Sequence, residues 1–188
     1  MTISRVILVL AALFALPLLP TSARAEQFQI GLGQDLPRPA YDGQLVLIFS
    51  KQEKKDLRAR DTVNAFYDSA QVFGAPIEGV KAGTSIRFEP ASPGFPLRAL
   101  ADLPRGRYFV QASLNVYTTY RRADGHVVKL PSANGGGQIF AKEPGNLFNT
   151  PRWIDFDPGR SGTISLTLDQ VNPAIPEPAD TDFIRHIK

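Results

Sequence analysis

The sequence predicts an all-β fold, an immunoglobulin-like antiparallel β-sandwich of roughly eight to nine strands, preceded by a cleaved signal peptide. Three observations favour this class. Short runs of β-branched and aromatic residues recur along the chain, and no long stretch keeps the period of an amphipathic helix. The 15 glycines and 16 prolines supply turns between these runs.

Residues 1–25 have the layout of a secretory signal. An early basic residue precedes an apolar run, Val6 to Leu19, and small side chains (Ala23 and Ala25) occupy the positions that a signal peptidase reads. We expect cleavage before Glu26 and a periplasmic or secreted protein. The apolar run is shorter than the roughly 20 residues that cross a bilayer, so we expect no membrane anchor after cleavage.

Composition limits what the mature chain can do. Removing the two arginines of the leader from the 21 basic residues leaves 19 against 18 acidic ones. A nearly neutral chain with dispersed basic residues does not favour nucleic-acid binding. The absence of cysteine excludes disulfides and a thiol nucleophile, so stability must come from an apolar core. We expect one sandwich domain over residues 26–172, then a proline-rich linker and the stub of an absent C-terminal domain over residues 173–188.

The first part of the domain predicts two strands and two polar connections. Phe28 and Ile30 alternate with polar neighbours, as in a half-buried strand. Residues 36–43 hold prolines and an Asp-Gly pair, which are typical of loops and turns. The continuously apolar run Gln44–Ser50 indicates a central strand covered on both faces. The charged segment Lys51–Arg60 indicates a solvated loop.

The middle of the domain is punctuated by glycine and proline. Residues 64–80 therefore predict short strands and bends. Lys81–Gly83 predicts a turn, and Thr84–Glu89 alternates like a strand with its apolar residues inward. Leu97–Leu103 predicts a short helix that docks through its leucines.

The strongest pattern is the long β-prone run Tyr108–Tyr120. Its two faces differ, because one is largely apolar and the other largely polar, which fits a strand with one face on the core. The apolar face carries Tyr108, Val110, Ala112, Leu114, Val116 and Thr118, and the polar face carries Phe109, Gln111, Ser113, Asn115, Tyr117 and Thr119. Asp124-Gly125 predicts a tight hairpin turn, after which His126–Leu130 returns antiparallel.

The last part predicts a loop, two strands and a connector. Residues 133–138 include three successive glycines and indicate a flexible loop. Residues 152–157 alternate like a strand before a Pro158-Gly159 turn, and residues 162–171 alternate again. The spaced prolines from Pro173 onward favour an extended, semi-rigid connector.

No arrangement of side chains predicts catalysis by this chain. The nearest match to a hydrolase nucleophile elbow, Gly159–Thr163, ends in threonine rather than glycine and follows a proline, which indicates a turn around Ser161. The two histidines, His126 and His186, lie at a hairpin end and in the terminal stub. A triad needs serine, histidine and carboxylate held together in one fold, so we expect no catalytic residue.

Metal and cofactor sites are not expected either. Asp155 and Asp157 share a strand face about 7 Å apart, a spacing open to calcium or to acid–base work on sugars. Calcium needs about six to eight oxygens, and no loop of Asp and Asn surrounds the pair, so a polar strand face is the favoured interpretation. Two histidines without cysteine do not favour zinc. The glycine loop lacks the strand-to-helix setting of a phosphate site.

The candidate interaction surface comprises Tyr117, Tyr120, His126 and Trp153. We expect the long strand and its hairpin, Tyr108 to Leu130, to present it together with the tail from Pro173. A sugar-stacking platform of Tyr117, Phe109 and Trp153 is the alternative, although aromatic side chains more often pack in cores and interfaces.

Several stretches resemble one family. They are "LADLPRGRYFVQA", "SLNVYTTYRRADGHVVKLP", "PGNLFNTP" and "SLTLDQVNPAI". In order, they are similar to the N-terminal region of large exported bacterial esterase-family proteins, in which a β-rich module precedes an α/β-hydrolase domain. The resemblance covers residues 44–188, and it implies that "DTDFIRHI" leads toward that hydrolase domain. The family's nucleophile elbow and triad partners lie beyond Lys188, so the resemblance assigns no catalytic residue here.

Three functional hypotheses follow. The first is a non-catalytic exported module that packs against or presents a hydrolase domain, supplied in cis or in trans. The second is a stand-alone sandwich that binds a carbohydrate or another small extracytoplasmic ligand. The third is a small hydrolase in its own right, which a p-nitrophenyl ester assay would detect.

Overall fold

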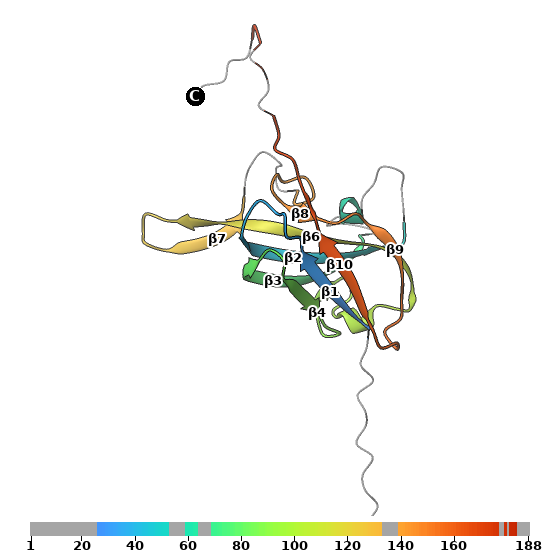
Figure 1. The fold of residues 1–188 in the computed structure, drawn as a ribbon. Helices are drawn as coiled ribbons and strands as arrows, with labels where there is room; N and C mark the ends of the chain where they lie inside the picture. The colour runs from blue at the N-terminus through green and yellow to red at the C-terminus, as the bar shows by residue number, and fades with distance from the viewer. Residues whose placement is uncertain are drawn as a thin grey trace, which may run out of the picture.

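Two β-sheets face each other across one apolar core in the computed structural model of the chain (Figure 1). The structure describes residues 26–52, 59–63, 69–132, 139–176, 179 and 181–183. The predicted signal peptide, the glycine loop, most of the charged segment and the end of the stub lie outside these residues. The all-β prediction is confirmed, and eight of the eleven strands in the described part have four residues or more.

The larger sheet is built around the longest strand, β6. Its order is β11-β8-β6-β2-β3-β5, and β7 and β9 also pair with β6. These strands are β2 (Ala40–Ser50), β3 (Gln71–Lys81), β5 (Gly94–Phe95), β6 (Gly106–Arg121), β7 (Val127–Pro131), β8 (Leu147–Phe148), β9 (Arg152–Phe156) and β11 (Gln170–Val171). All pairs in this sheet are antiparallel.

The smaller sheet contains β1 (Gln27–Leu32), β4 (Ser85–Phe88) and β10 (Thr163–Leu168), in the order β10-β1-β4. β1 pairs antiparallel with β4 but parallel with β10, which departs from the purely antiparallel sandwich expected. β1 and β10 are not consecutive in the chain, so no short turn forces them to be antiparallel. Their relative direction depends on how the two ends of the domain pack together. The alternation predicted for both strands is confirmed, because Phe28, Ile30, Leu166 and Leu168 are buried.

Aromatic rings from both sheets make the centre of the core. The ring of Phe49 lies 5.3 Å from that of Phe28, 5.6 Å from Phe73, 5.7 Å from Tyr108 and 6.0 Å from Phe156, measured between centroids. Edge-on arrangements at these separations suit the ring quadrupoles. The ring of Phe49 on β2 therefore contacts aromatic rings of both sheets.

β2 begins earlier than predicted. Residues 36–43 were expected to form a loop, but the strand starts at Ala40 and continues through a bulge between Tyr41 and Gly43. Tyr41 is buried in the core. Gly43 has φ +157°, and a Cβ there would lie 2.1 Å from the carbonyl oxygen of Asn115. The Asp42-Gly43 pair therefore lies where β2 and β6 approach closely, rather than in a turn. Glycine permits this approach because it has no side chain.

β3 is one continuous strand rather than the short strands and bends predicted for residues 64–80. Beyond Phe73 it has a partner on one side only, because β5 pairs with Val72 and Phe73 alone. An edge strand tolerates proline, so Pro76 does not interrupt it. The predicted helix is confirmed as a short 3₁₀ turn, η2 (Leu100–Asp102), docked by buried Leu100 and Leu103.

Part of the second face of β6 is also buried, which corrects the prediction that only one face of this strand lies on the core. Phe109, Gln111 and Ser113 lie under a cover made by the 3₁₀ turn η1 (Ala59–Thr62) and the segment around β8. The end of the charged segment contributes to this cover, because Ala59 and Arg60 are buried rather than solvated. The side chains of Gln111 and Ser113 are hydrogen-bonded to this cover, so their burial is tolerated.

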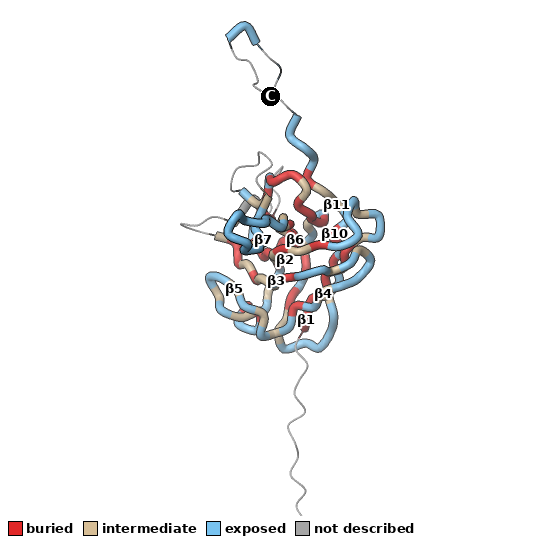
Figure 2. Tube along the Cα trace, turned by 90° about the vertical axis from the view of Figure 1, so that its left-hand side faces the viewer, coloured by how far each residue is buried: buried red, intermediate tan, exposed pale blue. Residues whose placement is uncertain are grey.

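The chain leaves the sheets after β11. Asn172 is buried, whereas residues 173–176 are exposed and lead away from the body of the domain (Figures 1 and 2).

Candidate interaction surface and pocket

The hairpin of β6 and β7 projects from the body of the domain (Figure 1). We call this projection the arm: Tyr117–Arg121, Val127–Pro131 and the turn between them. The two strands pair with each other along the whole projection. The predicted turn is confirmed, with φ +86° at Gly125 and the Asp124 carboxylate accepting a 3.1 Å hydrogen bond from the His126 amide.

One face of the arm continues the core-facing side of β6. Tyr120 lies opposite Val128 and Thr118 lies opposite Leu130, in the same alternation as buried Val116. Tyr120 is 41% exposed and Leu130 51% exposed. The pattern that fills the core therefore continues past the edge of the domain as an exposed apolar stripe.

On the opposite face, ion pairs connect the arm to the neighbouring strands. Lys129 forms ion pairs with Asp42 on β2, at 3.2 Å, and with Glu78 on β3. A 2.7 Å hydrogen bond from the Gly79 amide and the nearby ammonium lower the pKa of Asp42. The hydrogen bond to Glu78 raises the pKa of Lys129. The side chains of Asp42, Glu78 and Lys129, together with Tyr117, line a shallow hollow of about 360 Å³. The ion pairs connect the base of the arm to β2 and β3.

The structure does not gather the four predicted surface residues into one patch. Tyr120 and His126 lie on the arm, and Tyr117 lies at its base on the opposite face from Tyr120. Trp153 lies across from Phe109 in the register of β9 and β6. Eight residues of strand, roughly 26 Å, separate Phe109 from Tyr117.

Trp153 is part of a packed cluster rather than an open platform. Its ring lies 5.5 Å from that of Phe109, and the Arg107 guanidinium lies 5.3 Å from the Trp153 ring. Phe109 is itself buried. The geometry therefore agrees with packing and does not bring Tyr117, Phe109 and Trp153 onto one sugar-binding surface.

Of the two aspartates, Asp157 takes part in the turn after β9. Asp157 accepts a 2.9 Å hydrogen bond from the Gly159 amide and lies 3.5 Å from Arg105. Asp155 is exposed. Within the described ranges no three His, Asp or Glu side chains are grouped as metal ligands would be. Ser161 lies in the exposed connection before β10.

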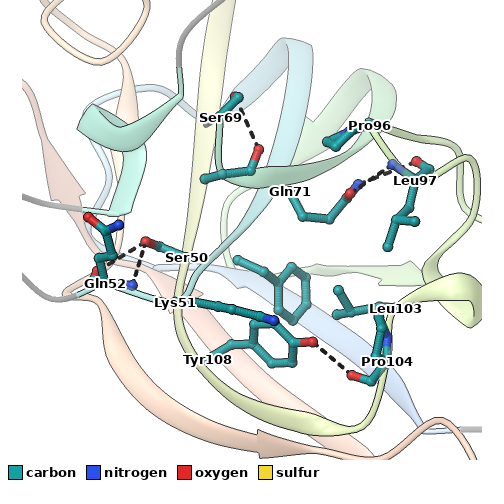
Figure 3. Close-up of a pocket in the computed structure, with 12 residues that line it drawn as sticks. Ser50, Lys51, Gln52, Ser69, Gln71, Pro96, Leu97, Leu103, Pro104 and Tyr108 are labelled. Carbon is teal, nitrogen blue, oxygen red and sulfur yellow. Dashed lines mark hydrogen bonds between the residues drawn. The ribbon is translucent and has the colours of Figure 1, made fainter. Parts of the chain in front are cut away.

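A pocket that the sequence did not predict lies at the other end of β6 from the arm. It has a volume of about 320 Å³ and is formed where the end of β2, the beginnings of β3 and β6, and the loop carrying η2 meet (Figure 3). Its wall residues come from four separate stretches of the chain, and no local motif marks them. Only the pairing of β2 with both β3 and β6 brings them together.

Compared with protein-family models, curated proteins and solved structures, the chain matches none of them. In the part of the chain that the structure describes, no helix has the length and apolar character needed to span a bilayer.

Proposed function

We propose that this chain is a non-catalytic exported module of immunoglobulin-like type that packs against or presents an α/β-hydrolase domain. The arm is its contact element. The supporting observation is the apolar face of the arm, on which Tyr120 and Leu130 continue the core pattern of β6 without a covering strand. Uncovered apolar surface of this kind marks interaction sites.

The anchoring of the arm also supports this role. Lys129 forms ion pairs with residues of β2 and β3, which favour one orientation of the arm relative to the sheet. A preformed contact element loses less conformational freedom when it binds. Export and the hydrolase as partner rest on the leader pattern and on the resemblance to exported esterase-family proteins.

The test is to co-express the chain with an α/β-hydrolase encoded next to it and to measure complex formation by size-exclusion chromatography with light scattering. We expect a stoichiometric complex that is lost in the double variant Y120S/L130S. The matched control is F95S/I139S, which changes two exposed apolar side chains outside both the arm and the tail from Pro173. Loss of the complex in the control, or its survival in the arm variant, would contradict the proposal.

The non-catalytic part is tested separately with the purified chain and p-nitrophenyl acetate. We expect no turnover above the background hydrolysis. Turnover that disappears when Ser161 or His126 is replaced would instead favour a small hydrolase.

A further inference from the structure

The pocket near Tyr108 has rigid walls. The side-chain amide of Gln71 binds both backbone groups of Leu97, accepting from its N–H at 2.8 Å and donating to its carbonyl at 3.3 Å. The Tyr108 hydroxyl donates to the carbonyl of Pro104 at 2.8 Å. The η2 loop is thus held to β3 at one end and to β6 at the other, so the cavity is largely preformed (Figure 3).

These bonds also occupy the polar groups of the walls. The Ser50 hydroxyl is engaged with both backbone groups of Gln52, each at 3.0 Å. Burial raises the pKa of Tyr108 above its ordinary 10.0, so its hydroxyl stays protonated and committed to Pro104. What the walls offer a ligand is therefore mainly apolar: Phe49, Ala70, Leu97, Leu103 and two prolines.

Lys51 is the charged side chain of the described lining. Lys51 lines the pocket, is exposed, and extends over it in the direction of Tyr108 (Figure 3). Among the described residues its ammonium has no ion-pair partner. A cation at the rim of an apolar cavity complements an anion that carries an apolar body.

The lining and volume of the cavity favour one kind of apolar group in the ligand. Aromatic rings form the floor, at Phe49 and Tyr108, and Pro96 and Pro104 stand at the rim. About 320 Å³ is at the lower end of the range for small-molecule sites, roughly 300–1,000 Å³, and suits one ring with a short arm. Aromatic floors favour flat ligands through offset and edge-on contacts.

We infer that this pocket binds a small one-ring aromatic carboxylate, with the ring on the Phe49–Tyr108 floor and the carboxylate at the Lys51 ammonium. A sugar fits less well, because its hydroxyls would find most of the wall donors and acceptors already used. A divalent cation would find no carboxylate among the lining residues that the structure describes. The pocket at Tyr108 lies about nine residues along β6 from the start of the arm at Tyr117. Ligand binding in the pocket therefore does not depend on whether the arm contacts a hydrolase domain.

The test uses the purified chain and three probes, followed by NMR titration of the backbone amides. Phenylacetate carries ring and charge, phenylacetamide keeps the ring without the charge, and hexanoate keeps the charge without the ring. We expect saturable shifts with phenylacetate, centred on Ala70, Leu97 and Tyr108, and binding at least about tenfold weaker for the other two.

Two variants test whether the Lys51 ammonium binds the carboxylate. K51Q should weaken phenylacetate about tenfold and leave phenylacetamide unchanged, whereas K142Q, an exposed lysine elsewhere, should change neither. Both are surface changes that leave the core intact, and thermal melts check this. The inference is overturned if phenylacetate gives no saturable shift, if the shifts map elsewhere, if either other probe binds equally well, or if K51Q has no effect.

Discussion

The side-chain amide of Gln111 donates a 2.7 Å hydrogen bond to the backbone carbonyl of Asn149 on a fully buried face of β6. The Asn149 side-chain oxygen accepts a 2.7 Å bond from the backbone N–H of Ala112. The side-chain oxygen of Gln111 accepts a 3.0 Å bond from the backbone N–H of Arg60. One polar residue in a long strand thus holds two distant segments over the sheet. This explains why a face that reads as polar in the sequence is buried in the fold.

Replacing Gln111 with leucine should destabilise the domain by about 2–4 kcal/mol. The leucine has a similar size, but it leaves the Arg60 amide and the Asn149 carbonyl buried without this partner, and each unsatisfied group costs about 1–3 kcal/mol. Urea denaturation followed by tryptophan fluorescence measures the change. Q34L, in an exposed loop, is the control and should shift stability little. Equal effects of the two substitutions would show that the buried amide has no special role.

Replacing Gly43 with alanine should cost about 3 kcal/mol. The new Cβ would lie 2.1 Å from the carbonyl oxygen of Asn115, which is backbone in the centre of the sheet and cannot move aside easily. G31A is the matched control, because its nearest neighbour would lie at an ordinary 3.6 Å. Thermal unfolding of both variants decides the matter, and a G43A protein as stable as G31A would contradict the bulge geometry.

Replacing Asp42 with asparagine should reduce stability at neutral pH and have less effect in acid. The pKa of Asp42 is lowered in the folded state, so its contribution is present above the ordinary value of 3.8 and is lost as pH falls through the lowered folded value. The stability gap between the wild type and D42N should therefore close below about pH 3.8. Denaturation curves at several pH values measure it, with exposed D169N as the control. A gap that stays constant into acid would disprove the linkage.

Replacing Asn172 with alanine should destabilise the domain by about 1–3 kcal/mol. Its side chain donates to the buried carbonyls of Ala141, at 3.1 Å, and Glu143, at 2.9 Å. These bonds fasten the end of the last strand to the cover over β6. I175A, three residues further on and exposed, should have almost no effect. If chemical denaturation gives the same midpoint for N172A and the wild type, the Asn172 hydrogen bonds do not stabilise the attachment of the last strand to the cover over β6.

The residues themselves determined the strands and turns of this protein. Alternation placed Phe28, Phe88 and Leu166 inward, the apolar run at Leu45–Phe49 marked the central strand, and Asp124-Gly125 marked the hairpin, because strand periodicity and turn geometry act over a few residues. Tertiary structure alone decided what covers each face. The parallel pairing of β1 with β10, the burial of Gln111 and the pocket beneath Lys51 all depend on segments far apart in the chain. A period of two says which side chains share a face, but whether that face meets water, a polar cover or another sheet depends on where the rest of the chain packs.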